Sequence, residues 1–470
     1  MENGKRIDEM ASLPVTRLLV RYCVPAIATI IINALYNMVD RVFVGQVMGY
    51  AGIAAVTVGG TAMTLMLALS NLIGIGAMAF FALSLGEGER ELASRITNQA
   101  FTLLLILGGL ELAAGLLFLP QICRGLGAGE ESFLYAQQYL QIIFLGSVFH
   151  AVGTGMVGFL RAEGFPTAAL VCTAGGAVLN ILLDALFLLV FGWGIAGAAA
   201  ATIIAQAFSA GYFLWWFTGP KRRITPLCVR DMRLQRKIVG RIFAMGSSIF
   251  AMQGGVFILQ VVQQKMLHSW GNDVITGDMA ISALGITTNI GGLIAQINVG
   301  FRQGIQPLFS YNYGARLFGR VRELLWKSIV SLFVILLTCE VLLFLLSTPA
   351  VELFGEPETQ TLREFYVFAL RSFNIFVPLM PLNSVMCSYY QSVGMVRRAN
   401  LVSMMRPVFF AIPFILVLSF ALKSIHGVFL GMPAADLASC VVCGILLKRT
   451  WKQLKEMEVH GTVSNPVHEL

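Results

Sequence analysis

Charged residues are scarce in this sequence. Only 12% of its 470 residues are Asp, Glu, Lys or Arg, whereas 57% are hydrophobic. Soluble domains have about 25% charged residues, and the mean hydropathy of +0.77 is also high. Apolar runs fill nearly the whole chain and leave no room for a soluble domain, so the composition indicates an integral membrane protein.

Residue groups that would indicate catalysis or a cofactor are also missing. The eight cysteines are scattered without a disulfide framework, and the only CxxC, Cys440–Cys443, lies in an apolar run without a second pair, where packing is its expected role. We find no Ser/His/Asp constellation, metal-ligand spacing or phosphate-binding loop. We therefore expect neither an enzyme nor a cofactor. No cleavable signal peptide is evident, because Met1–Thr16 is polar and the first apolar run is long enough to span a membrane.

Long apolar runs are abundant instead. A helix needs about 20 mostly apolar residues to cross the ~30 Å hydrocarbon core, and barrel strands of about 10 alternating residues do not fit the pattern. The sequence predicts an all-α membrane protein with twelve transmembrane helices, near 15–44, 53–84, 93–119, 135–160, 167–191, 195–217, 238–264, 281–311, 324–347, 361–390, 399–422 and 427–447.

The net charge of +8 reflects topology. Lys and Arg gather in alternate loops, above all in 218–237, and such loops face the cytoplasm. We therefore expect a bacterial-type inner membrane location, two cytoplasmic termini, no nucleic-acid partner and a monomer. The predicted organisation is a first lobe (1–217), a cytoplasmic basic linker (218–237), a second lobe (238–447) and a cytoplasmic tail (448–470).

The two halves repeat one another. Gly74-Ile75 returns as Gly304-Ile305, and Gly164 returns as Gly394, at a shift of 230 residues. Each copy holds six spans, so both enter the membrane in the same direction and are related by a pseudo-two-fold axis along the membrane normal. A substrate cavity between the two lobes is the expected consequence, although gene doubling without functional meaning is the alternative.

Polar residues of the first half form pairs four residues apart, a spacing that puts both on one helix face. Three spans carry such pairs: Tyr36 with Asp40, Asn180 with Asp184, and Thr202 with Gln206. At 1.5 Å rise per residue, Asp40, Asp184 and Thr202 each lie roughly 10 Å below the outer surface. The spacing and depth predict one polar site inside the first lobe.

This site suits a proton or Na⁺. A carboxylate at the centre of a span costs about 2.5–3.5 kcal/mol on insertion scales, so it has a partner or a function. Two close carboxylates cannot both ionise cheaply, which favours a bound proton; Na⁺ held by Asp40, Asn180, Asp184 and Thr202 would neutralise them equally well. Alternatively the acids are separate structural groups, with Asp40 paired to Arg41.

The second half lacks this site, because a shift of 230 residues turns Asn180, Asp184 and Thr202 into Phe410, Phe414 and Met432. Asp436 in the last span is a candidate to pair with Arg406 in the eleventh.

The chain resembles the multidrug and toxic compound extrusion (MATE) family. The resemblance rests on four stretches: 33–45 (NALYNMVDRVFVG), 160–164 with 179–184 (LRAEG, LNILLD), 194–198 (GIAGA) and 306–314 (QPLFSYNYG). It implies two six-helix lobes that work by alternating access, and export of organic cations and other amphipathic molecules in exchange for H⁺ or Na⁺. Within the family, the DinF-like branch has a cation site at positions matching Asp40, Asn180, Asp184 and Thr202, with Tyr36 and Ala198 nearby.

We therefore expect an ion-coupled antiporter of drugs or similar small molecules. Amide side chains are the candidates for the substrate cavity: Asn33, Asn37, Gln206, Gln253 and Gln260. The alternatives are a flippase for lipid-linked sugars, which would favour a basic cavity, or an exporter of one metabolite. Arg302 and Arg371 are the only obvious cations in the middle of spans.

Overall fold

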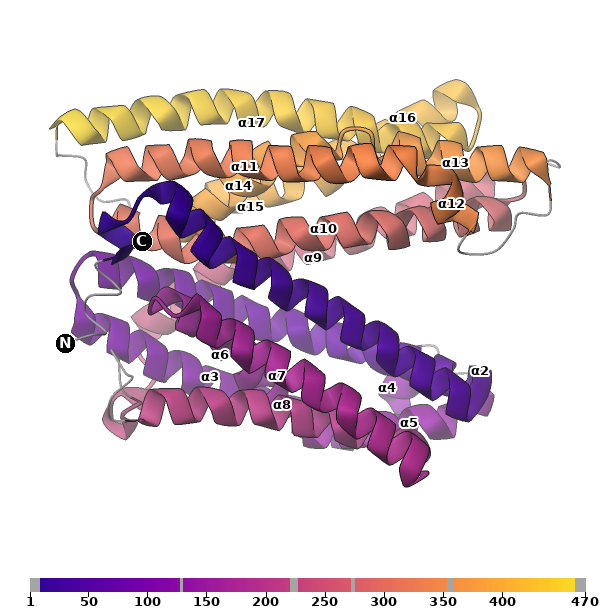
Figure 1. The fold of residues 1–470 in the computed structure, drawn as a ribbon, viewed down its shortest axis with the longest axis horizontal. Coiled ribbons are helices and arrows are strands. Elements are labelled where there is room, and N and C mark those ends of the chain that lie inside the picture. Colours follow the sequence, from indigo (N-terminus) through magenta and orange to yellow (C-terminus); the bar gives the residue numbers. More distant parts are fainter. Residues whose placement is uncertain (1–8, 127–129, 220–226, 272–274, 353–358, 461–470) are drawn as a thin grey trace. The chain divides into compact units, whose positions relative to one another are not determined.

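The computed structural model describes residues 9–126, 130–219, 227–271, 275–352 and 359–460, and every element within them is helical (Figure 1). Within the described residues, eleven helical segments are long and apolar enough to cross a membrane. Two further pieces, Phe133–Leu145 and Ser147–Ala162, meet at an angle of 59° and make a twelfth span when they are taken together. Each of the twelve predicted runs thus has a helical counterpart, and the predicted all-α membrane fold is confirmed.

The chain divides into two compact units. The first comprises Met1–Phe250 with Ser310–Arg316, and the second comprises Ala251–Phe309 with Leu317–Leu470. The long helices α9 (Arg236–Ser269) and α10 (Gly277–Gly314) contribute residues to both. The predicted lobe boundaries at 217 and 238 stay a prediction.

The first unit contains the elements α2 (Val15–Gly86), α3 (Arg90–Leu117), α4 (Leu119–Gly125), α5 (Glu130–Leu145), α6 (Ser147–Ala162), α7 (Pro166–Asp184), the π-helix η1 (Ala185–Val190), α8 (Gly194–Thr218) and the 3-10 turn η2 (Val229–Met232). α2 is helical throughout its 72 residues, or about 108 Å at 1.5 Å per residue, which is far longer than one membrane crossing. It contains the first two spans, Val15–Tyr36 and Ala55–Gly86.

The second unit contains the elements α11 (Phe318–Leu345), α12 (Ser347–Glu352), α13 (Gln360–Asn374), the 3-10 turn η3 (Val377–Leu379), α14 (Met380–Ser392), α15 (Val396–Met404), the π-helix η4 (Met405–Ala411), α16 (Ile412–Leu422) and α17 (His426–His460). The predicted tail begins as a continuation of α17, because pairs such as Lys452–Glu456 stabilise an exposed helix. Residues 461–470 of that tail lie outside the described residues.

The predicted basic linker is held by side chains of α3. Asn98 Oδ1 accepts from the Cys228 backbone N–H (2.7 Å), and Gln99 Oε1 accepts from that of Gln235 (2.9 Å). Thr102 Oγ1 donates to the Met232 carbonyl (3.2 Å). The described part of the linker is therefore fixed to the first unit; its residues 220–226 lie outside the described ones.

The close approach of α2 to α9 in the first unit depends on glycine. A Cβ on Gly246 would overlap the Leu72 carbonyl, and one on Gly76 would overlap the Ile242 carbonyl and lie 2.7 Å from the Gly246 nitrogen. Small residues allow membrane helices to approach this closely.

Gly246→Ala should therefore destabilise the protein by about 1–3 kcal/mol, because the backbones have to separate. Gly240→Ala, in the same helix but with nothing within 4 Å of its Cβ position, should be neutral or slightly stabilising. The measurement is the thermal unfolding midpoint in detergent, and equal midpoints for the two variants would contradict this account of the contact.

Candidate functional site

The polar residues predicted to form one site come from helices that pack against one another. Within the first unit, α2 contacts α5, α7 and α8, and α8 contacts α5 and α7. α2 contributes Asp40, α7 contributes Asn180 and Asp184, and α8 contributes Thr202. All four side chains are buried, and Asp184 has no exposed surface at all.

The two carboxylates lie within electrostatic range, since the charge of Asp40 acts on Asp184. Asn180 joins Asp184 to α8. In the amide orientation that satisfies both neighbours, Asn180 Nδ2 donates to Asp184 Oδ2 (3.2 Å) and Asn180 Oδ1 accepts from the Thr202 backbone N–H (3.3 Å). Thr202 Oγ1 in turn donates to the Ala198 carbonyl within α8 (3.0 Å). The acids from two distant parts of the chain therefore share one polar centre.

The second carboxylate oxygen of Asp184 is the atom of this centre at which an ion could bind. Asp184 Oδ1 is buried without a hydrogen-bond partner among the described residues, none of which forms an ion pair with Asp184. A buried polar atom in this state costs about 1–3 kcal/mol. A proton on Asp184, or a Na⁺ ion held by carboxylate, amide, hydroxyl and carbonyl oxygens, would satisfy it. The donor set fits either ion.

Tyr139 of α5 is a member of the centre that the sequence analysis missed. It is buried and lies within electrostatic range of Asp40, Tyr36 and Asp184. Its hydroxyl also lies 3.9 Å from Met63 Sδ. The signal in the sequence was the same four-residue spacing, since Tyr135 precedes it by four; Tyr135, however, is 38% exposed.

Apolar side chains pack around the polar centre, and a π-helix lies next to it in the chain. Ala198, Tyr139 and Val44 belong to one buried cluster with Leu188 of η1. The π-helix η1 begins directly after Asp184. Single π-turns often occur at functional sites, where they change the backbone pairing next to a working side chain.

The remaining candidates are dispersed. Asn33 is partly buried on α2, and Gln206 is partly buried on α8 with its Oε1 lacking a partner among the described residues. Gln253 and Gln260 are exposed on the part of α9 that belongs to the second unit. The side chains of Asn37 and Arg41 lie outside the described residues. The substrate cavity therefore stays a prediction.

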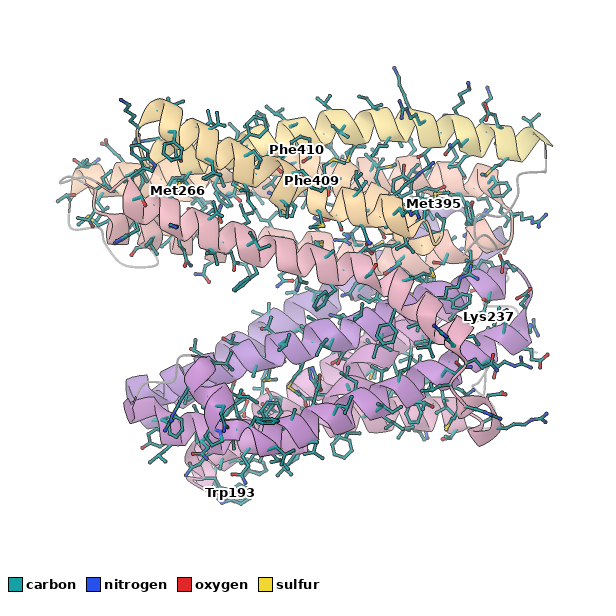
Figure 2. The ribbon with its side chains drawn as sticks, turned by 180° about the vertical axis from the view of Figure 1, so that it is seen from behind. Trp193, Lys237, Met266, Met395, Phe409 and Phe410 are labelled. Atoms are coloured by element: carbon teal, nitrogen blue, oxygen red, sulfur yellow. The ribbon has the colours of Figure 1, made fainter. Side chains whose placement is uncertain are left out.

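The equivalent positions of the second unit are apolar, as the sequence predicted. Met432 is buried in an apolar cluster, and the partly buried Phe410 and Phe414 pack against that cluster. The rings of Phe410 and Phe414 are stacked, with their centroids 6.4 Å apart. Figure 2 shows Phe410 on its helix within this unit. The paired acids are thus a feature of one half of the chain only.

Comparison with known proteins identifies the family of this chain. The MatE family model matches residues 25–186 and again 255–417. The chain belongs to the MATE family. The two matches begin 230 residues apart, which is the repeat spacing found in the sequence. MATE proteins are transporters, and the multi-pass membrane architecture follows from the fold.

Several relatives share this family's length and fold. The multidrug export protein MepA of Staphylococcus aureus (strain MRSA252) is 23% identical over 434 residues, covering 92% of this chain and 93% of its own. A multidrug resistance MATE transporter solved in an outward-facing conformation aligns with a TM-score of 0.88 at 21% identity, covering 95% of this chain and 98% of that one. A MATE structure in a bent conformation aligns with a TM-score of 0.87 at 21% identity, covering 97% of this chain and 99% of that one.

The contact of Asn180 with Asp184 yields a stability prediction. Asn180→Leu removes a donor to the Asp184 carboxylate, so the free energy of unfolding should fall by about 1–3 kcal/mol when that carboxylate is ionised. The loss should shrink at low pH, where a protonated Asp184 no longer needs the donor. Thermal unfolding of the variant and of the wild type over a series of pH values measures this.

The matched control is Asn289→Leu, because Asn289 is exposed and its side chain donates to the Gly285 carbonyl of its own helix (2.8 Å). A loss in Asn180→Leu that is the same at every pH would contradict the role assigned to the carboxylate.

Proposed function

We propose that this MATE protein exports organic cations, drugs or other amphipathic small molecules in exchange for H⁺ or Na⁺ bound at Asp40 and Asp184. The observation that carries the proposal is the fully buried Asp184 with an unsatisfied oxygen, close to a second carboxylate. The function of the relative MepA, multidrug export, supports the drug part of the proposal.

The coupling follows from the cost of buried charge. With no ion bound, two nearby carboxylates repel one another and are poorly solvated. A bound H⁺ or Na⁺ removes that cost, so ion occupancy favours one packing of α2, α7 and α8 over another. A ligand shifts an equilibrium only by its difference in affinity for the two states. An ion gradient across the membrane would thereby drive the exchange between outward-open and inward-open forms.

Within this mechanism each residue has a defined task. Asp40 and Asp184 hold the ion, Asn180 orients Asp184, and Thr202 with the Ala198 carbonyl supplies further oxygen atoms. Tyr139 lies close enough to Asp40 and Asp184 to respond to the charge of the pair, and it also interacts with Tyr36. We further propose a monomer in a bacterial-type cytoplasmic membrane with both termini inside, since basic residues gather on that side.

The test is transport in proteoliposomes. A pH gradient and a Na⁺ gradient are imposed separately, and the movement of ethidium is followed by fluorescence. We expect one of the gradients to drive ethidium transport in the wild type. Asp184→Asn and Asp40→Asn should lower the gradient-driven rate to the level of empty liposomes. The reason is that an uncharged amide cannot bind and release the coupling ion as a carboxylate does.

The matched control is Asp231→Asn, which changes an acid in the linker outside the spans and should transport normally. Full activity of Asp184→Asn would remove this residue from the mechanism, and transport under neither gradient would refute ion coupling. Transport of a lipid-linked sugar but no ethidium would favour the flippase instead.

A further inference from the structure

Arg302 is a permanent positive charge in the middle of a span of the second unit. It lies on α10 twelve residues before Gly314, or about 18 Å from that end of the helix. A guanidinium group is not deprotonated in proteins. Charged residues at this depth normally pair with an opposite charge or serve a function.

Among the described residues, the side-chain contacts of Arg302 are with sulfur atoms. Its Nη1 lies 3.5 Å from Met252 Sδ and its Nη2 lies 4.0 Å from Cys387 Sγ. Thioether and thiol sulfur are weak acceptors. Arg302 Nε is buried without a hydrogen-bond partner, and no carboxylate among the described residues forms an ion pair with this side chain.

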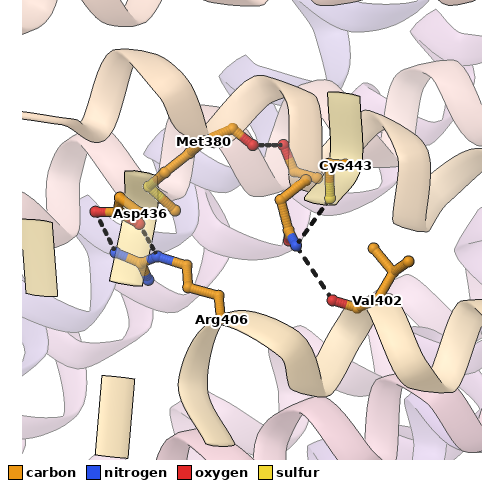
Figure 3. Close-up of polar contacts among 7 residues, drawn as sticks. Met380, Val402, Arg406, Asp436 and Cys443 are labelled. Carbon is orange, nitrogen blue, oxygen red and sulfur yellow. Dashed lines mark hydrogen bonds and ion pairs between the residues drawn. The ribbon is translucent and has the colours of Figure 1, made fainter. Parts of the chain in front are cut away.

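Two other arginines of the same unit show the contrast. Arg406 forms a two-point ion pair with the buried Asp436, with Nε–Oδ1 at 2.5 Å and Nη2–Oδ2 at 3.4 Å (Figure 3). Arg371 donates to Ser347 Oγ (2.8 Å) and to the Phe344 carbonyl (3.2 Å). Arg406 and Arg371 therefore have oxygen acceptors from the protein, whereas no such acceptor for Arg302 is found in the part of the chain that the structure describes.

Two buried amides lie on the same face of α10 as Arg302. Asn298 and Gln306 are four residues before and after it and are 6% and 4% exposed. Gln306 Nε2 and Asn298 Oδ1 have no hydrogen-bond partner among the described residues. An amide can present its nitrogen or its oxygen to a ligand. Arg302 itself is only partly buried, so a ligand has access to it.

We propose that Arg302 and Gln306 form an oxyanion-binding site that takes the carboxylate or phosphate group of an amphipathic molecule. The planar fork of a guanidinium fits both groups, and the Gln306 amide adds a donor. Met252 supplies an apolar, adaptable contact for the rest of the ligand. The site deepens the proposed function, on which it rests for its place in transport, by adding acids and zwitterions to the substrates.

The test is equilibrium binding to the purified full-length protein in phosphatidylcholine nanodiscs. The probes are dansylglycine and dansylglycinamide, which are fluorescent and differ only in a carboxylate against an amide. A hydrogen-bonded charge pair corresponds to roughly a tenfold to hundredfold difference in affinity. We therefore expect the wild type to bind dansylglycine at least tenfold more tightly than the amide.

Three variants complete the test. Arg302→Gln should lower the affinity for dansylglycine to that for the amide and leave the amide unchanged. Arg302→Lys keeps the charge without the fork and should show an intermediate preference, which also serves if Arg302→Gln does not fold. Lys265→Gln removes an exposed cation from α9 and should bind like the wild type.

Equal affinity of the wild type for both probes, or a preference that survives Arg302→Gln, overturns the proposal. Adding phosphatidylglycerol to the nanodiscs identifies the source of the oxyanion. Competition in the wild type but not in Arg302→Gln assigns the site to a lipid headgroup, and its absence assigns the site to a soluble acid. Asp184→Asn should keep the carboxylate preference, so failure of ion coupling and failure of this site are separate results.

Discussion

A carboxylate inside a membrane protein must be neutralised, and this constraint governs the first unit. Asp40 and Asp184 act on one another inside a closely packed group of helices, where their charges are poorly solvated. Asn180 satisfies one oxygen of Asp184 and leaves the other open. The surrounding apolar cluster keeps the low dielectric environment that makes ion occupancy a large energetic term.

The repeat supplies one framework with two different chemistries. The family model matches both halves at the repeat spacing, so the helices are equivalent although their polar residues are not. The positions of Asn180, Asp184 and Thr202 are occupied in the second unit by Phe410, Phe414 and Met432, which pack as apolar core. That unit instead contains the Arg406–Asp436 pair and the weakly partnered Arg302. If the proposals above hold, the paired acids of the first unit would bind a cation and Arg302 of the second unit would bind an anionic group.

Irregular helical turns accompany the buried charges. The π-helix η1 begins immediately after Asp184, and the π-helix η4 contains Arg406. A π-turn changes the local hydrogen-bond pairing of the backbone and lets a helix bend or rotate at small cost. The 59° bend between α5 and α6 follows Tyr139 by less than two turns. Buried charges and altered backbone pairing therefore occur together in both units.

The sequence by itself determined the all-α membrane fold, the twelve spans, the repeat and the apolar second-half counterparts of the site. These features depend on hydropathy and on helical period, both of which are local properties of the chain. The spacing of four also identified Asp40, Asn180, Asp184 and Thr202 as residues on inward faces. The tertiary structure alone decided that Tyr139 joins them, that the helix from Val15 to Gly86 is unbroken, that one span bends at Gly146, and that Arg302 faces sulfur where Arg406 faces Asp436. Each of these depends on which helix faces are in contact, and contacts between residues far apart in the chain leave no periodic signal in it.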